Sequence, residues 1–207
     1  MTTAEKVPPK RRRSREETRQ RLLDAALGVF ARNGFERATV DEIVREAGFS
    51  KGAFYVHFES KEDLFWEILR ERIEANQRQL RETIEPGLDV VEAERRILTT
   101  LFDARKTEPL GPAVYYEFVA HAMRNDKVRE RLAEFYASWH AFVVETLRLG
   151  RESGMVRDDV DLELQASALM ATFEGALIQS QLAPEGLRLS DNVESFAKLL
   201  ADWVVRR

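Results

Sequence analysis

The nine residues from Ser50 to Phe58, SKGAFYVHF, combine hydrogen-bonding side chains with the apolar spacing of a helix. Wound at about 100° per residue, this helix turns Phe54 and Phe58 toward a core. Its opposite side carries only slim residues, which are Gly52, Ala53 and Val56. Its two flanks carry Tyr55 and His57. A slim surface edged by hydrogen-bonding groups suits a helix that enters a DNA major groove, with the bases at the slim side and the phosphates at the edges.

Residues that could form a catalytic or metal site are sparse in this sequence. The chain has no cysteine, which excludes disulfides, thiolate metal sites and cysteine nucleophiles. Glu117 and His121 are four residues apart and form one candidate pair. The Glu-x-x-His motif of di-iron bundles, the His-Glu-x-x-His motif and a glycine-rich phosphate loop do not occur. We therefore expect no enzyme activity, no metal and no cofactor.

The charge of the chain is unevenly distributed. Residues 1–60 hold 12 Lys and Arg against 9 Asp and Glu, whereas residues 61–207 hold 20 against 27, and the whole chain has a net charge of −4. A basic head on an acidic body is expected when only one end of a protein meets a polyanion. The basic cluster at residues 10–13, together with Arg15, can reach phosphates or the minor groove, or form only a solvated charge run.

Nothing in the sequence indicates a membrane protein. No apolar run approaches the roughly 18 residues of a membrane span. The polar, basic N-terminus lacks the apolar core of a signal peptide. We expect a cytoplasmic protein without membrane contact.

The element that carries SKGAFYVHF is predicted to be the third of several helices. Apolar spacing predicts a first helix over residues 15–32, which Asn33 and Gly34 end. Thr39 and Glu42 have the spacing of a capping box, which opens a short helix through Ala47. Gly48 closes that helix, and the next two helices are capped by Ser50 and Ser60. Two short helices joined through one glycine form a helix-turn-helix.

Five more helices are predicted in the remainder of the chain, near residues 88–106, 113–123, 126–150, 161–183 and 190–206. No strand-like alternation occurs. The fold class is therefore all-α with about nine helices. An N-terminal three-helix DNA-binding domain with a helix-turn-helix is followed by a C-terminal helical domain, to which the family resemblance given below assigns ligand binding and dimerisation. The predicted parts are a flexible basic arm (1–14), the DNA-binding domain (15–60) and the body (61–207).

The segment TVDEIVREAGFSKGAFYVHFESKEDLF, residues 39–65, resembles the helix-turn-helix and following helix of the TetR family of transcriptional regulators. The resemblance extends through RLLDAALGVFARNGFERATV, residues 21–40. It departs at Ala53, where a threonine is usual, and at Val44, where alanine is common. The Ala53 departure removes a hydroxyl contact.

The resemblance implies specific roles for residues of this segment. The positions that correspond to contacts with the DNA backbone are Lys51, Tyr55, His57 and Lys61. The positions that face the bases are Gly52, Ala53 and Val56. The two predicted N-caps, Thr39 and Ser50, complete the expected DNA-binding set.

The body is expected to bind a second copy of the chain. Its last two helices carry apolar stripes at helical spacing, formed by Leu162, Ala166, Leu169, Phe173, Ala176 and Leu177 and by Phe196, Leu199, Leu200 and Trp203. Both stripes are also explained by packing within one chain. The resemblance favours a homodimer through helices 161–183 and 190–206, which would read two half-sites of an operator.

The resemblance also implies a small-molecule effector, whose pocket in the body is expected to be lined by aromatic side chains. The candidates are Phe102, Tyr115, Phe118, His121, Trp139, Phe142 and Phe173, although aromatic residues at helical spacing are more often plain core. The sequence thus predicts a ligand-responsive repressor, released from a double-stranded operator by an apolar or aromatic effector. The fourth helix, which starts at Lys61, is the expected lever. The alternatives are an all-α protein-interaction module and a small-molecule-binding helical enzyme without DNA binding.

Overall fold

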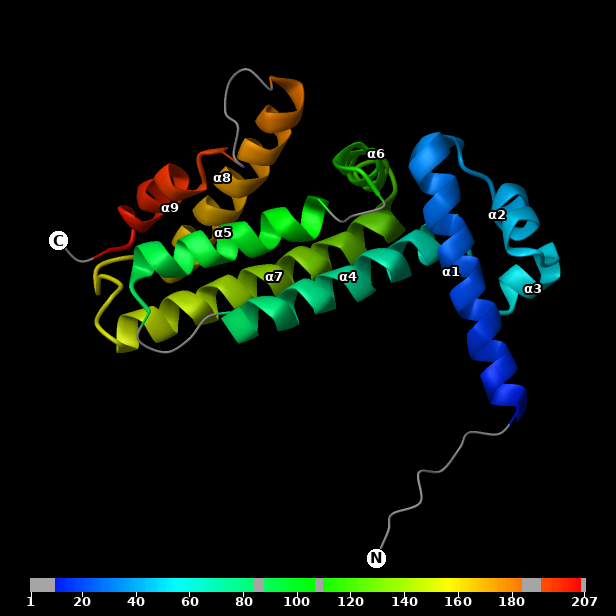
Figure 1. Ribbon diagram of the computed structural model, residues 1–207, viewed down its shortest axis with the longest axis horizontal. Helices are drawn as coiled ribbons and strands as arrows, with labels where there is room; N and C mark the ends of the chain where they lie inside the picture. The colour runs from blue at the N-terminus through cyan, green and yellow to red at the C-terminus, as the bar shows by residue number, and fades with distance from the viewer. Residues whose placement is uncertain (1–9, 84–87, 107–109, 184–190, 206–207) are drawn as a thin grey trace, which may run out of the picture. The chain divides into compact units, whose positions relative to one another are not determined.

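The computed structural model describes residues 10–83, 88–106, 110–183 and 191–205, without the side chains of residues 10–13, 102 and 104–106. These described residues form helices and an isolated antiparallel bridge between Val156 and Val205, and no strand (Figure 1). The helices are α1 (Lys10–Arg37), α2 (Val40–Ala47), α3 (Lys51–Tyr55), α4 (Lys61–Thr83), α5 (Val90–Lys106), α6 (Pro112–Ala122), α7 (Asp126–Glu152), α8 (Leu162–Leu182) and α9 (Val193–Ala201). The all-α fold class is confirmed.

The first helix is longer than the sequence suggested. α1 begins at Lys10, so the last residues of the expected arm are helical, and the rest of that arm, residues 1–9, lies outside the described residues. The run from Lys10 to Glu17 contains no glycine or proline and is rich in Arg and Glu, which are good helix formers. The expected stop at Gly34 is present as an interruption, with φ 76° and ψ 173°, after which a short helical stretch continues to Arg37.

The last helix is shorter than expected. α9 ends at Ala201 instead of continuing to residue 206. The backbone amide of Arg157 donates to the carbonyl of Val204 at 2.9 Å, and Val205 pairs with Val156. Val204 and Val205 therefore pair with another segment, while their amides still donate to the carbonyl of Ala201, each at 2.9 Å.

Helix contacts divide the chain into two compact units, which differ from the expected domains. One unit comprises Met1–Arg72 with Glu108–Val128, and the other Ile73–Thr107 with Arg129–Arg207. α6, which follows residue 61 in sequence, thus belongs to the unit of the helix-turn-helix. α4 begins in the first unit and ends in the second.

The first unit is built around phenylalanines. Four fully buried rings from α1, α4 and α6 contact one another, with centroid distances of 4.5 to 5.8 Å, and they are Phe30, Phe35, Phe65 and Phe118. α1 packs against both α2 and α6. Aromatic pairs at these distances add to the stability gained from burial. α2 and α6 therefore pack against the same helix, and the phenylalanine core joins α6 and α4 to it.

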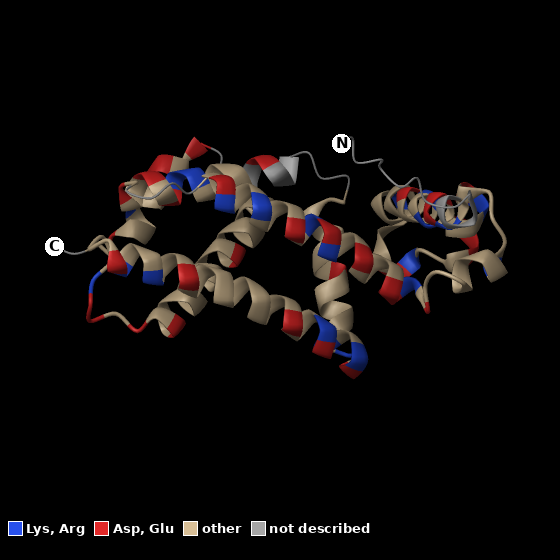
Figure 2. Cartoon of the chain, turned by 90° about the horizontal axis from the view of Figure 1, so that it is seen from below, with Lys and Arg blue, Asp and Glu red and all other residues tan. Residues whose placement is uncertain are grey.

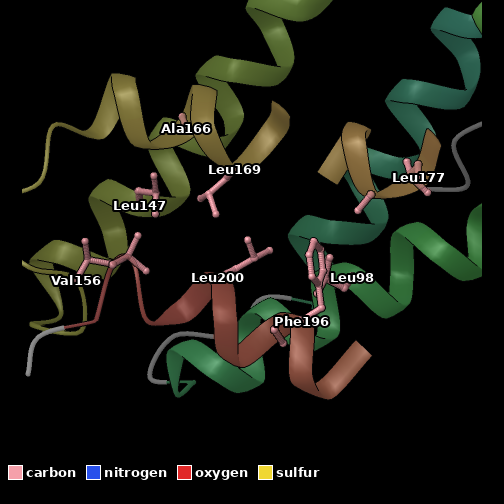
Figure 3. Packing of buried hydrophobic residues seen from close by; sticks show 11 residues of the cluster. Leu98, Leu147, Val156, Ala166, Leu169, Leu177, Phe196 and Leu200 are labelled. Carbon is pink, nitrogen blue, oxygen red and sulfur yellow. The ribbon is translucent and has the colours of Figure 1, made fainter. Parts of the chain in front are cut away.

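The second unit has an aliphatic core to which α5, α7, α8 and α9 contribute (Figure 3). Its members include most of the expected dimer stripes, namely Ala166, Leu169, Ala176, Leu177, Phe196 and Leu200, and Leu162 and Phe173 pack against them. These stripe residues serve the packing of a single chain. Two stripe residues, Leu199 and Trp203, are instead exposed.

Charges of both signs are spread over the helices (Figure 2). No helix in the described part of the chain combines the length and apolar character needed to cross a bilayer.

Candidate nucleic-acid interface

The start of α2 is fixed by the predicted capping box. The hydroxyl oxygen of Thr39 accepts from the amide of Glu42 at 3.3 Å, and the carboxylate of Glu42 accepts from the amide of Thr39 at 3.0 Å. The Thr39 hydroxyl also donates to this carboxylate, and these bonds lower the pKa of Glu42. The hydroxyl proton of Thr39 is therefore directed to Glu42.

The turn between α2 and α3 is held by Gly48 and by an arginine of α1. Gly48 has φ 74° and ψ 32°, the left-handed conformation that glycine adopts without a Cβ penalty. Arg21 donates to the carbonyl of Ala47 at 2.8 Å, and its guanidinium lies 4.7 Å from the ring centre of Phe49. After the turn, the hydroxyl oxygen of Ser50 caps α3 by accepting from the amide of Ala53 at 3.2 Å.

The two sides of α3 differ sharply in exposure. Phe54 and Phe58 are 0% and 2% exposed, whereas Tyr55 and Val56 are 54% and 62% exposed. Gly52 is also exposed, and a Cβ at this position would meet only the Ser50 hydroxyl, at 3.7 Å. The helical hydrogen bonds continue past Tyr55, since the amide of Phe58 donates to the carbonyl of Phe54 at 3.0 Å. The slim side of α3 is thus open, and its aromatic side is anchored.

The expected phosphate-contacting residues at the edges of α3 have different surroundings. Lys51 is exposed and its ammonium forms an ion pair with Asp41 at 3.0 Å, which raises the pKa of Lys51. His57 is half-buried, and burial, followed by Arg15 and Arg19, lowers its pKa. His57 is therefore mainly neutral at pH 7 and can donate one hydrogen bond without adding charge.

Lys61 lies differently from the other expected DNA contacts. Its ammonium donates to the carbonyls of Phe35 and Glu36, at 2.7 and 3.3 Å, and sits 4.4 Å from the centre of the Phe35 ring. Two of its three donors are therefore used inside the first unit. Its role as a phosphate contact remains a prediction.

Sequence reasoning missed Arg21 at this interface and named Arg15 only as part of the basic cluster of the arm. Arg15 donates to the carbonyl of Val56 at 3.5 Å, so Arg15 and Arg21 each join α1 to a backbone carbonyl of the helix-turn-helix. Both belong to a run of charged residues at the start of α1. Spacing alone does not distinguish such residues from solvated ones.

Two family models match the sequence. Residues 22–68 match bacterial regulatory proteins of the tetR family, and residues 90–204 match the C-terminal domain of BetI-type transcriptional repressors. The chain belongs to the TetR family of transcriptional regulators. The resemblance carried by residues 39–65 is thereby confirmed.

Individual transcriptional regulators are similar to this protein over most of its length. The transcriptional repressor KstR2 of Rhodococcus jostii (strain RHA1) is 32% identical over 146 residues, which cover 70% of this chain and 71% of that protein. The structure of Salmonella enterica GusR has a TM-score of 0.72 and 29% identity, covering 90% of this chain and 96% of GusR. A regulator from Saccharomonospora viridis, solved in complex with choline, has a TM-score of 0.76 at 24% identity, covers 93% and 100% of the two chains, and shows the shared fold.

The expected effector-binding aromatics of this TetR-family protein belong to both units. Tyr115, Phe118 and His121 lie on α6 in the first unit, where Phe118 is fully buried in the phenylalanine core. In the second unit Trp139 stacks on Phe142, with ring centres 5.5 Å apart. Phe173 packs against the aliphatic core, and the side chain of Phe102 lies outside the described residues.

Proposed function

We propose that this transcriptional regulator is a repressor that binds a palindromic or pseudopalindromic operator as a homodimer, with one α3 in each of two major-groove half-sites. The observation that carries the proposal is the exposure of α3, whose slim side is open while Phe54 and Phe58 are buried. A major groove admits a helix, and a helix without long side chains on its outer face can approach the bases most closely.

The residues of this surface divide into two roles. Gly52, Ala53 and Val56 approach base edges, where Val56 is suited to contact a thymine methyl group. The groups that contact the sugar–phosphate backbone are Ser50, Lys51, Tyr55, His57 and Lys61. Thr39 supports this surface by fixing the start of α2 through its bonds with Glu42. Base contacts specify the sequence, whereas phosphate contacts position the protein.

The homodimer is supported by an exposed apolar face on α8. Leu164, Ile178 and Leu182 are 69%, 39% and 80% exposed. Together with the small residues between them the face is Leu164, Ala168, Ala171, Gly175, Ile178 and Leu182, which all lie within about 40° of one direction at helical spacing. A Cβ added to Gly175 would meet no atom within 4 Å. Small residues at its centre allow a second α8 to approach closely, and the exposed Leu199 and Trp203 of α9 enlarge the apolar surface.

An effector is proposed to act through the second unit. A small apolar or aromatic molecule that favours one arrangement of that unit would weaken operator binding by a coupling free energy of typically about 1–3 kcal/mol. α4 is the expected lever because it is continuous from one unit into the other. As a protein that acts on DNA, the regulator is expected to work in the cytoplasm.

Selection of bound duplexes from a random pool tests the proposal. We expect enrichment of a two-fold symmetric sequence, whose affinity falls steeply as the salt concentration rises. Measuring the affinity for the selected duplex again in the presence of candidate apolar ligands identifies the effector as the ligand that weakens binding. Failure to enrich any duplex, together with salt-insensitive capture of a protein partner, would instead favour an interaction module.

A further inference from the structure

The end of α1 is interrupted at Gly34, and the turn formed there, residues 34–36, leads toward the helix-turn-helix. Gly34 has φ 76° and ψ 173°, so the backbone leaves the helical path just before Phe35 and Glu36. Such a break removes backbone groups from the helix ladder, and buried groups of this kind need new partners. The amides and carbonyls of Phe35 and Glu36 find these partners on two other helices.

The amides are bound by a carboxylate from α6. Oε2 of Glu117 accepts from the amide of Phe35 at 2.7 Å and from the amide of Glu36 at 3.3 Å. Hydrogen bonds to a carboxylate are roughly twice as strong as neutral ones. A Cβ at Gly34 would lie 2.6 Å from this oxygen, so the approach of Glu117 requires glycine there.

The carbonyls of the same two residues are bound by a lysine from α4. Lys61 of α4 donates to both of them, at 2.7 and 3.3 Å. The ring of Phe35 is fully buried, 5.0 Å from the ring centres of both Phe65 and Phe118. Residues of α4 and α6 therefore bind the backbone of this turn and also pack around the Phe35 side chain.

This turn connects directly to α2. The side-chain amide of Asn33 donates to the carboxylate of Glu42 at 3.2 Å, and that carboxylate also closes the capping box with Thr39. α3 follows α2 after the short turn at Gly48. A change in the path of residues 35 and 36 would therefore reorient α2 and α3 together relative to α1.

We infer that Glu117 is a positioning residue for DNA recognition, which sets the orientation of α2 and α3 by holding the amides of Phe35 and Glu36. The inference rests on the proposed operator binding. It also assigns a role to the Glu117–His121 pair, because His121 lies one turn further along α6 and its Nδ1 is 3.2 Å from the Glu36 carboxylate. Both side chains of the pair thus face the turn.

The test compares Glu117→Ala, Glu117→Gln and the control Glu130→Ala, which removes an exposed carboxylate of α7. Affinity is measured for the duplex that wild-type protein enriches from a random pool, at a temperature where circular dichroism shows every variant to be folded. Hydrogen exchange of the peptide that spans residues 33–38 is measured in parallel. If the wild type enriches no duplex, the proposed function fails before this inference is tested.

We expect Glu117→Ala to bind the duplex about 10-fold more weakly and to exchange the Phe35 amide faster, because that amide loses its acceptor. Glu117→Gln replaces the charged acceptor by a neutral one, so it should bind about 3-fold more weakly than wild type, between the wild type and Glu117→Ala. The control should bind as the wild type does. A residue that only stabilised the fold would lower the unfolding midpoint and leave the affinity of the folded protein unchanged, and that result would overturn the inference.

Glu117→Gln carries the test alone if Glu117→Ala does not fold. A weaker affinity with faster exchange of the Phe35 amide supports the positioning role. Wild-type affinity with wild-type exchange contradicts it.

Discussion

The guanidinium of Arg21 on α1 donates to the carbonyl of Ala47, the last residue of α2, at 2.8 Å. The same group lies over the ring of Phe49 at 4.7 Å. Arg21 therefore satisfies a carbonyl that the end of α2 leaves without a helical partner and covers the first residue after the turn. One side chain thus ties the first helix to the helix-turn-helix.

Arg21→Met should lower the free energy of unfolding by about 1–2 kcal/mol, through loss of the hydrogen bond and the cation–π contact. Arg32 offers a matched control, because it also joins α1 to α2 through an ion pair with Glu46, but at the surface. Arg32→Met should cost less than about 1 kcal/mol. Urea unfolding of both variants measures the difference. Equal losses of unfolding free energy would show that the Arg21 contact stabilises the protein no more than the surface ion pair does.

Gly52→Ala should separate stability from DNA binding. An added Cβ meets only ordinary contact at this helical position, so the variant should be as stable as the wild type or more stable by up to about 1 kcal/mol. The same methyl group thickens the slim side of α3, and affinity for the selected duplex should fall about 10-fold.

Gly48→Ala is the matched control for Gly52→Ala. The φ of 74° at Gly48 is unfavourable for alanine, so Gly48→Ala should lose about 1–2 kcal/mol of stability. Its folded fraction should keep wild-type affinity. Wild-type affinity of Gly52→Ala would show that α3 does not approach the bases closely.

Local features of the first unit could be predicted from sequence because the interacting residues are close in the chain. The capping box of Thr39 and Glu42, the left-handed Gly48 and the Ser50 cap are each set within a few residues. The contacts of Lys61 with residues 35 and 36 could not be predicted in this way, since they depend on how distant helices pack.

The apolar faces of α8 show a second limit of sequence reasoning. This helix carries apolar residues on more than one side, so periodicity cannot decide which side is internal. The stripe through Ala166 and Leu169 is buried, and the face that contains Leu164 and Ile178 is open. Only the packing of α8 into the core that it shares with α5, α7 and α9 distinguishes the two faces.

Ile178→Arg should dissociate the homodimer, because it places a charge on the exposed apolar face of α8. Sedimentation equilibrium should give twice the chain mass for the wild type and the chain mass for the variant. Leu149→Arg is the control, since Leu149 is an exposed leucine of α7 outside this face. A dimeric Ile178→Arg would place the interface elsewhere.

Glu94 should make the second unit less stable as the pH rises. Burial raises its pKa from 4.5 to about 7, so the folded state binds this proton more tightly than the unfolded state. The resulting stability is fully present below about pH 4.5 and is lost as the pH rises through 7, by up to about 3 kcal/mol. Glu94→Gln should remove this dependence.

Urea unfolding at about pH 5 and about pH 8 measures the effect as a difference between wild type and variant. Glu92 is the matched control, because hydrogen bonds from Arg95 and then Arg96 lower its pKa to about 2. The contribution of Glu92 to the free energy of unfolding is lost only as the pH falls below about 4.5. Glu92→Gln should therefore keep the wild-type pH dependence between about pH 5 and about pH 8. An unchanged pH dependence of Glu94→Gln would contradict the assignment to Glu94.

Protection of a single thiol at position 56 tests the DNA-binding surface most directly. The chain contains no cysteine, so Val56→Cys and the control Leu149→Cys each carry one reactive group. With saturating selected duplex, maleimide modification of Val56→Cys should slow by on the order of 10-fold, because the side chain faces the groove floor, while Leu149→Cys should react as before. Equal rates for Val56→Cys with and without duplex would contradict the account.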